Sequence, residues 1–260
     1  MRAFLEKIIV EAGEMAKKHF EKGVSFSLKS NQNDYLTIAD TEVSEFLVSS
    51  IQREFPTHAI VSEEMPEKIE GVSEYTWYID PIDGTRNFAH GIPTWAVMVA
   101  VQKQGETVLS GVYFPIVQQL FIGDSKTSCT YKNGVAIHAQ LNRADLHESI
   151  GLFGIHTEAS SYVSHADLFV SALHNFYQSS GGRAQTFGCS AMLVYVCDGT
   201  FTFACRNSGL DWDYLPIAHM GKLSGCSIVT SDGFPWTKER RDLIIVPPLL
   251  SNQLLSYFKQ

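Results

Sequence analysis

The segment that follows the apolar run ending at Ile79 carries two carboxylates at a spacing suited to metal and phosphate chemistry. Asp80 and Asp83 lie in the sequence Asp-Pro-Ile-Asp-Gly, where the Pro and the Gly favour a turn, and a short helix is predicted to begin at Thr85. Carboxylate oxygens suit Mg2+, Mn2+ or Ca2+, and the amides at a helix start offer donors to a phosphate. The alternative interpretation is an Asx-type turn with two solvated aspartates.

Other acidic residues share this kind of position, at the junction of a predicted strand or loop with a turn or helix start. The full set is Glu63, Asp80, Asp83 and Asp213. Such acids together can hold two cations that activate a water and stabilise a leaving alkoxide. Each acid alone is also compatible with a solvated carboxylate, and Asp213 with the N-cap of its helix. Asp40 and Thr85 are candidates for orienting the attacking water, with helix capping as the alternative.

Composition narrows the class of protein. A chain of 260 residues with 45% hydrophobic content can bury a large core, and without repeats or linkers it predicts a single domain over residues 1–260. A net charge of −8 with scattered Lys and Arg argues against nucleic-acid binding. Five cysteines without a Cys-x-x-Cys pattern indicate reduced thiols and a cytoplasmic protein. Neither a signal peptide nor an apolar run of membrane-spanning length is expected, so membrane partners are not predicted.

The pattern of apolar residues predicts both helices and strands. Helices are expected over residues 3–20, 43–55, 167–176, 190–196 and 213–223, the last opened by Asp213 with Pro216 in its first turn. Strands are expected over 59–61, 75–79, 201–204 and 242–247, with an antiparallel meander over 95–121 and a hairpin at Asn133 and Gly134. Because no strict βαβ rhythm is present, we expect an α/β layered sandwich with mixed or antiparallel sheets rather than a doubly wound parallel sheet.

Several separated motifs together resemble the inositol monophosphatase family. They are residues 80–88 (Asp-Pro-Ile-Asp-Gly-Thr-Arg-Asn-Phe), the upstream Ser-Glu-Glu at 62–64 and the downstream Trp-Asp at 212–213. The resemblance extends to residues 36–40 and 233–235, so it covers most of the chain. It implies the layered αβαβα sandwich of the family, which agrees with the fold expected from the pattern of elements.

The resemblance also implies a binding site for two or three Mg2+ ions. Glu63, Asp80 and the main-chain carbonyl of Ile82 would bind the first ion, and Asp80, Asp83 and Asp213 the second. A third, weaker ion would depend on Glu63 and waters, with Lys29 beside it. The metal ligands implied are therefore Glu63, Asp80, Ile82, Asp83 and Asp213.

The same resemblance implies roles in catalysis and substrate binding. Asp40 and Thr85 match the pair that activates the water, with Glu63 counted beside them, and the amides of Gly84 and Thr85 match the phosphate cradle. The substrate contacts implied are Asp83, Gly84, Thr85, Gly188, Cys189, Ser190 and Arg206. Family members hydrolyse phosphate monoesters by in-line attack of a metal-activated water, and they commonly form homodimers.

The substrate-contacting positions depart from the family pattern at two places. Arg206 stands seven positions before Asp213, where inositol-preferring members carry a glutamate that accepts hydroxyl hydrogen bonds. Arg206 would instead face an acidic or second-phosphate group of the substrate, or form a surface salt bridge. Cys189 stands among residues 187–191, where small polar residues are expected.

The functional hypotheses that follow belong to two classes. The first is a Mg2+-dependent phosphatase acting on a small phosphate ester, with inositol 1-phosphate the first substrate to try. Histidinol phosphate and other sugar or nucleotide phosphates are the alternatives. The second class is a protein-binding partner of the transcription machinery, a role that the resemblance implies for some bacterial members.

Overall fold

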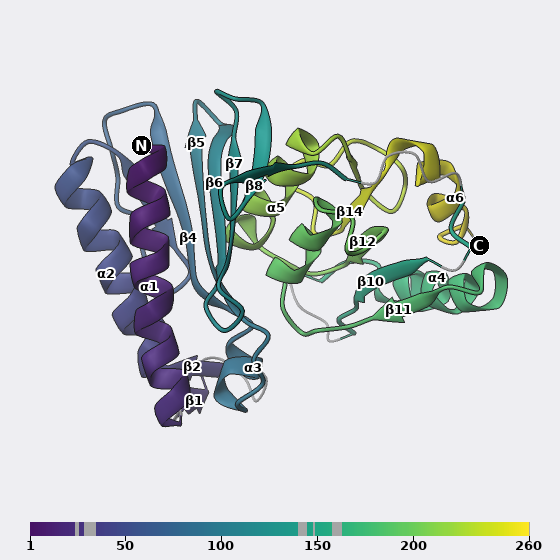
Figure 1. The fold of residues 1–260 in the computed structure, drawn as a ribbon, viewed down its shortest axis with the longest axis horizontal. Helices are drawn as coiled ribbons and strands as arrows, with labels where there is room; N and C mark the ends of the chain where they lie inside the picture. The colour runs from purple at the N-terminus through teal and green to yellow at the C-terminus, as the bar shows by residue number, and fades with distance from the viewer. Residues whose placement is uncertain (24–25, 29–34, 140–144, 148, 158–162, 260) are drawn as a thin grey trace.

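The computed structural model describes residues 1–23, 26–28, 35–139, 145–147, 149–157 and 163–259, and it alternates layers of helices with layers of sheet (Figure 1). The first layer consists of α1 (Arg2–Lys22) and α2 (Ile38–Glu54). These helices pack on one face of a seven-stranded sheet through apolar residues at helical spacing, among them Leu5, Ile9 and Val43. The predicted first two helices are thus confirmed.

The seven-stranded sheet has the order β3-β4-β5-β6-β7-β8-β9. Its strands are β3 (Ala59–Ser62), β4 (Tyr75–Asp83), β5 (Ala96–Lys103), β6 (Glu106–Phe114), β7 (Gln119–Asp124), β8 (Cys129–Lys132) and β9 (Val135–Ile137). Strand β3 runs parallel to β4, and every other neighbouring pair is antiparallel. The predicted meander and the hairpin at Asn133 and Gly134 are therefore confirmed.

A second, five-stranded sheet has the order β11-β10-β12-β14-β13. Its strands are β10 (Ile150–Gly154), β11 (Arg183–Gln185), β12 (Phe203–Arg206), β13 (Ser227–Val229) and β14 (Leu243–Val246). Strand β10 is parallel to β11 and β12, whereas β14 is antiparallel to β12 and β13. The sheet is mixed, as expected.

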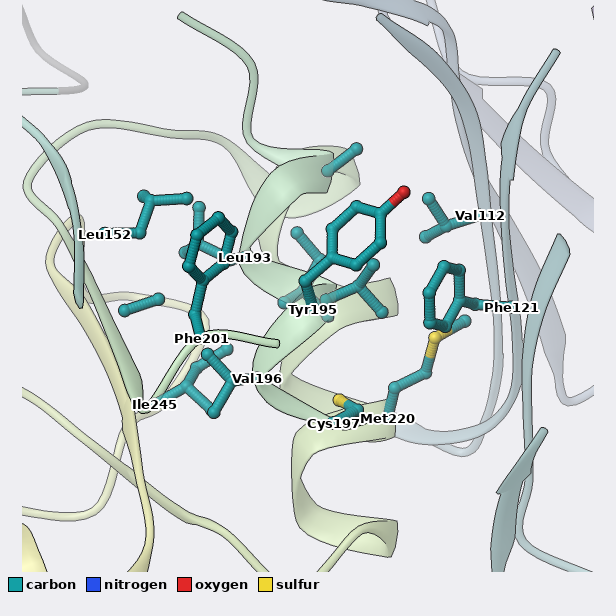
Figure 2. Close-up of a cluster of buried hydrophobic side chains, with 14 of the residues drawn as sticks. Val112, Phe121, Leu152, Leu193, Tyr195, Val196, Cys197, Phe201, Met220 and Ile245 are labelled. Atoms are coloured by element: carbon teal, nitrogen blue, oxygen red, sulfur yellow. The ribbon is translucent and has the colours of Figure 1, made fainter. Parts of the chain in front are cut away.

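The middle layer lies between the two sheets and holds α5 (Asp211–Leu223) and the 3-10 helix η1 (Ala191–Val196). Figure 2 shows Tyr195 of η1 facing Val112 and Phe121 of the seven-stranded sheet, with Phe201 and Ile245 on the side of the five-stranded sheet. The ring of Tyr195 lies 5.2 Å from that of Phe121, centroid to centroid. This central core joins the two sheets into one packed body.

The outer face of the five-stranded sheet is covered by α4 (Ala166–Ser180) and α6 (Ser251–Ser256), the latter preceded by the short 3-10 helix η2 (Pro248–Leu250). Phe169, Phe176 and Leu254 bury their side chains against Phe153 and other residues of this sheet. The succession helix, sheet, helix, sheet, helix is the predicted αβαβα sandwich. Beside these layers, β1 (Phe26–Leu28) and β2 (Tyr35–Thr37) form a two-stranded ribbon near α3 (Thr85–Ala89) (Figure 1).

Two local predictions are wrong. Strand β4 continues through Pro81 to Asp83 with a shifted register against β5 between Asp80 and Asp83, so this segment is an irregular strand rather than a turn. Helix α5 begins at Asp211, before the predicted start at Asp213, so Pro216 lies inside the helix and beyond its first turn. Within the described part of the chain, no helix has both the length and the apolar character to cross a membrane.

Candidate metal and phosphate site

Three aspartates from two separate layers meet where β4 ends. Asp80 and Asp83 lie in the irregular end of β4, and Asp213 lies in the first turn of α5. One carboxylate oxygen of each falls within 4.8 Å of the others. The register shift brings Asp80 and Asp83 to the same side of the strand end, since without it their three-residue separation would place them on opposite faces.

Asp80 has the least satisfied side chain of this group. It is 2% exposed, and its Oδ1 atom is buried without a hydrogen-bond partner among the described residues. Burial raises the pKa of Asp80 well above its ordinary value, and the charges of Glu63, Asp83 and Asp213 raise it further. A buried carboxylate oxygen without a donor is costly unless a cation neutralises it. The carboxylate oxygens of these aspartates, with Asp80 Oδ1 lacking a hydrogen-bond partner among the described residues, fit a hard divalent cation such as Mg2+.

Asp83 is held by the segment that leads into η1. Its Oδ1 accepts the backbone N–H of Ser190 at 2.9 Å, and its Oδ2 accepts that of Ala191 at 2.6 Å. The Cys189 thiol also donates to Asp83 Oδ2 at 2.8 Å. The Ser190 hydroxyl donates to Asp213 Oδ1 at 2.8 Å, so this segment links the two aspartates. Cys189 and Ser190, predicted as substrate contacts, are therefore also supports of the acidic cluster.

Asp213 serves two purposes at the start of α5. Its Oδ2 accepts the backbone N–H of Leu210 at 2.7 Å, which caps the helix from inside the first turn rather than from the predicted N-cap position. Burial and the charge of Asp83 raise the pKa of Asp213, whereas the charge of Arg206 opposes that shift. Helix capping and membership of the acidic cluster thus occur together.

Asp40 and Thr85 are brought together from α2 and α3. The Thr85 hydroxyl lies 3.3 Å from Asp40 Oδ1 and 2.9 Å from the main-chain oxygen of Ile82. Asp40 Oδ2 accepts the backbone N–H of Thr37 at 2.8 Å and its hydroxyl at 2.5 Å, in a capping box at the start of α2. The predicted capping role of Asp40 is confirmed, and its other oxygen remains directed toward Thr85.

Glu63 and Ile82 adjoin the same strand end. Glu63 directly follows β3, and its backbone N–H donates to the carbonyl of Ile79 on β4 at 3.0 Å. The charge of Glu63 acts on Asp80. The carbonyl of Ile82 lies 2.9 Å from the Thr85 hydroxyl and has two lone pairs, so at least one is available to a further partner. Lys29, which the sequence predicted beside a third ion, falls outside the described residues.

Glycines allow the close approach of the two segments around α3. Gly84 has a φ of 88°, and a Cβ atom there would lie 3.1 Å from the Thr94 oxygen and 3.3 Å from the Cys189 Cβ atom. Gly188 also has a positive φ, 65°, and lies against Asn87. These contacts hold the start of α3 close to the segment before η1.

The sequence analysis missed Asn87 as part of this arrangement. Its Nδ2 atom donates to the main-chain oxygens of Thr94, at 2.8 Å, and Phe187, at 2.5 Å. A buried Asn inside the motif at residues 80–88 was the available signal, but its partner at position 187 could not be identified without the fold.

Arg206 lies at the end of β12, on the five-stranded sheet. It is 8% exposed, and its Nε donates to the main-chain oxygen of Ser208 at 2.7 Å. Among the described residues no ion pair involves Arg206, so the alternative of a surface salt bridge is wrong. Its charge nevertheless acts on Asp213 and Asp83, which places it near the acidic cluster.

Comparison with known proteins agrees with this architecture. A protein of Aquifex aeolicus (strain VF5) called fructose-1,6-bisphosphatase/inositol-1-monophosphatase is 27% identical over 217 residues, which cover 82% of this chain and 80% of that protein. The Nus factor SuhB of Escherichia coli (strain K12) is 29% identical over 211 residues, covering 78% of this chain and 75% of its own.

Solved structures match over nearly the whole chain. The extragenic suppressor protein suhB from Bartonella henselae superposes with a TM-score of 0.90 at 23% identity, covering 99% of this chain and 98% of that one. An IMPase from Thermotoga maritima gives a TM-score of 0.84 at 24% identity, covering 97% and 94%. The model of the inositol monophosphatase family matches residues 1–259, so this chain belongs to the inositol monophosphatase family.

Proposed function

We propose that this protein is a Mg2+-dependent phosphate-monoester hydrolase. The observation that carries the proposal is the meeting of Asp80, Asp83 and Asp213 within 4.8 Å, with a buried Asp80 oxygen that no described residue satisfies. Such a cluster is unfavourable by itself and becomes favourable when cations neutralise it. Membership of the family supports the same activity.

The residues proposed to hold the ions are those that surround the strand end. Glu63, Asp80 and the Ile82 carbonyl would bind one ion, and Asp80, Asp83 and Asp213 a second. Bound Mg2+ would supply charge neutralisation and Lewis acidity to the phosphate ester. Two or three ions per site are proposed, and Glu63 would contribute to binding the third.

The chain's own groups would position the attacking water and the phosphate. The Thr85 hydroxyl, 3.3 Å from Asp40 Oδ1, can donate its proton to that carboxylate while it accepts a hydrogen bond from the water. The backbone N–H groups of Gly84 and Thr85, at the start of α3, would donate to phosphate oxygens. Asp40 is buried and fixed by Thr37, so the pair is positioned before substrate binds.

The substrate proposed first is inositol 1-phosphate, with histidinol phosphate and other sugar or nucleotide phosphates as alternatives. The test is phosphate release from a panel of these esters, with Mg2+ and with EDTA. We expect release from at least one ester that EDTA abolishes, whereas release that persists in EDTA would contradict the metal-dependent mechanism. A small-molecule substrate, a cytoplasmic location and a homodimer are proposed together with this activity.

A second candidate function is binding to the transcription machinery. The observation that favours it is the match to relatives called Nus factor SuhB, at 29% identity over 78% of this chain. In a pull-down with purified transcription proteins, this function predicts binding that survives both EDTA and Asp80→Asn. Absence of binding in both conditions would exclude it for those partners.

A further inference from the structure

Arg206 is a buried cation whose guanidinium is incompletely bonded. Its one hydrogen bond to a described residue runs from Nε to the Ser208 carbonyl. Among the described residues, the two terminal nitrogens Nη1 and Nη2 have no hydrogen-bond partner. The residue is nevertheless more than nine-tenths buried. Because leaving a largely buried charge unpaired is unfavourable, an anion bound to these nitrogens would stabilise the guanidinium.

The negative charges nearest to Arg206 have other partners. Asp213 and Asp83 act on it through space, yet no ion pair among the described residues joins either of them to it. Their oxygens accept hydrogen bonds from Ser190 and Ala191, and they belong to the proposed metal ligands. Once cations neutralise these aspartates, Arg206 is left as an uncompensated positive charge at the edge of the site.

Gly154, the neighbouring position on β10, lets the Arg206 side chain pack closely against that strand. A Cβ atom on Gly154 would lie 3.2 Å from both Cγ and Nη1 of Arg206, so a larger residue there would displace the guanidinium. Asn207 anchors the next segment, because its side chain accepts the backbone N–H of His156 and donates to its carbonyl, both at 2.8 Å.

His156 lies within reach of the charge of Arg206. Burial lowers the pKa of His156 to about 4, and the positive charges of Arg206 and Arg86 lower it further. Arg86 belongs to α3, beside the seven-stranded sheet, whereas Arg206 belongs to the five-stranded sheet. Arg86 and Arg206, from two different layers of the fold, therefore both act electrostatically on His156.

We infer that Arg206 forms a subsite for a second anionic group, phosphate or carboxylate, on a phosphate-ester substrate. This inference rests on the proposed function and specifies its substrate class. A planar guanidinium whose Nη1–Nη2 edge has no partner among the described residues suits bidentate binding of either group. A polyol with hydroxyl groups alone would leave it unpaired, so the preferred ester carries a second negative charge in its leaving group.

Two matched pairs of esters separate the sources of this second charge. In the first pair, 2-phosphoglycerate differs from glycerol 2-phosphate by a carboxylate in place of a hydroxymethyl group. In the second, fructose 1,6-bisphosphate differs from fructose 1-phosphate by a second phosphate. Phosphate release would be measured with Mg2+ for the wild type, Arg206→Gln and Arg206→Lys, with Arg53→Gln on the exposed end of α2 as the control.

We expect the doubly anionic member of at least one pair to have a kcat/KM about tenfold or more above its partner. Arg206→Gln should abolish that preference mainly by raising the KM of the doubly anionic esters. Arg206→Lys should keep part of the preference, since it keeps the charge without the planar fork. Arg53→Gln should behave as the wild type.

Other results would overturn the inference. They are equal use of both members of each pair by the wild type, a preference that survives Arg206→Gln, and an equal loss for all esters in that variant. If no ester is hydrolysed, the proposed function itself fails, and calorimetric titration of fructose 1,6-bisphosphate with Mg2+ present decides the subsite. Binding weakened at least tenfold by Arg206→Gln would support it, and unchanged binding would overturn it.

Discussion

Asp80 and Asp83 have the same chemistry but opposite environments. Asp80 has a buried oxygen without a donor, whereas Asp83 accepts two backbone N–H groups and a thiol. The first side chain is unfavourable in the absence of a cation, and the second stabilises the segment before η1. The same substitution should therefore change the stability of the metal-free protein in opposite directions.

We predict that Asp80→Asn raises the thermal midpoint in EDTA by about 2–4 °C, because it removes a buried like charge worth about 1 kcal/mol. Asp83→Asn should lower the midpoint, since an amide nitrogen would then face a backbone donor at a cost of about 1–3 kcal/mol. Calorimetry of both variants in EDTA measures the difference. A lower midpoint for Asp80→Asn would show that its carboxylate is a structural group.

The site residues differ in how far the sequence could predict them. Asp80, Asp83 and Thr85 lie within one local motif, so residue type and spacing were sufficient to predict that they lie close together. The burial of Arg206 depends on its neighbour Gly154, which only the pairing of β10 with β12 brings close. A sequence window contains no information on that contact, and the alternative of a surface salt bridge consequently remained open until the fold was known.

At the scale of elements, α3 is joined to the segment before η1 by one side chain. Asn87 donates to the carbonyl oxygens of Thr94 and Phe187, and the segment after Phe187 supplies the donors that hold Asp83. The position of Asp83 therefore depends on Asn87 although the two side chains share no bond.

We predict that Asn87→Ala lowers the free energy of unfolding by about 1–3 kcal/mol, because buried carbonyl oxygens lose their donor. It should also reduce kcat for phosphate release about tenfold through the displaced supports of Asp83. Urea unfolding and steady-state kinetics measure both effects, with the exposed Gln52→Ala on α2 as the control. A normal kcat in a destabilised variant would show that the contacts of Asn87 stabilise the fold without positioning Asp83.

Helix α5 is joined to the seven-stranded sheet by a buried histidine. His219 Nδ1 lies 2.7 Å from the Ser110 hydroxyl on β6, and its Nε2 lies 2.9 Å from the Ser125 hydroxyl just after β7. Burial lowers the pKa of His219 to about 4. The neutral imidazole is thus the form that the fold accommodates.

This pKa predicts a loss of stability in acid. An unfolded histidine titrates near a pKa of about 6.5, so below that pH the unfolded chain binds a proton that the folded protein excludes until about pH 4. The free energy of unfolding should fall as the pH falls, and His219 should account for about 2 kcal/mol of the decrease between pH 7.5 and 5. Urea unfolding at the two pH values measures this decrease.

The matched variants isolate the contribution of His219. In His219→Gln, most of that change in the free energy of unfolding with pH should be lost. His174→Gln, on the exposed surface of α4, should keep the pH dependence of the wild type. An identical pH dependence in the wild type and His219→Gln would contradict the assignment.

Elements with strong internal periodicity were predictable, and those defined by pairing were not. Helix α1 shows its apolar stripe in the sequence and ends at Gly23, whose φ is 83°. The irregular end of β4 was predicted as a turn because Pro81 and Gly84 are turn residues, whereas pairing with β5 keeps the segment in the sheet. Strand β10 was missed because both of its faces are buried, Leu152 against the middle layer and Phe153 against α4, so its sequence shows no alternation of apolar and polar residues.

At the scale of the whole molecule, the acidic cluster joins the seven-stranded sheet to the middle layer. Asp80 and Asp83 belong to β4, and Asp213 belongs to α5, whose other side packs on the five-stranded sheet. A cation bound by all three would therefore stabilise the packing of the layers as well as the site.

We predict that Mg2+ raises the thermal midpoint of the wild type and does not raise that of Asp80→Asn. Saturation at a hundred times the dissociation constant would add about 2.7 kcal/mol to the free energy of unfolding. Thermal scans over a Mg2+ series, with ionic strength held constant by NaCl, measure the shift. An equal shift in both proteins would indicate a general salt effect.

Phosphate release by the wild type and by Asp80→Asn is the experiment that tests whether the acidic cluster makes this protein a metal-dependent phosphatase. Over the panel of inositol 1-phosphate, histidinol phosphate and the sugar phosphates, we expect Mg2+-dependent release by the wild type. Asp80→Asn should reduce that release at least about a hundredfold while remaining folded. Release by Asp80→Asn at the wild-type rate, or release by the wild type in EDTA, would contradict the account.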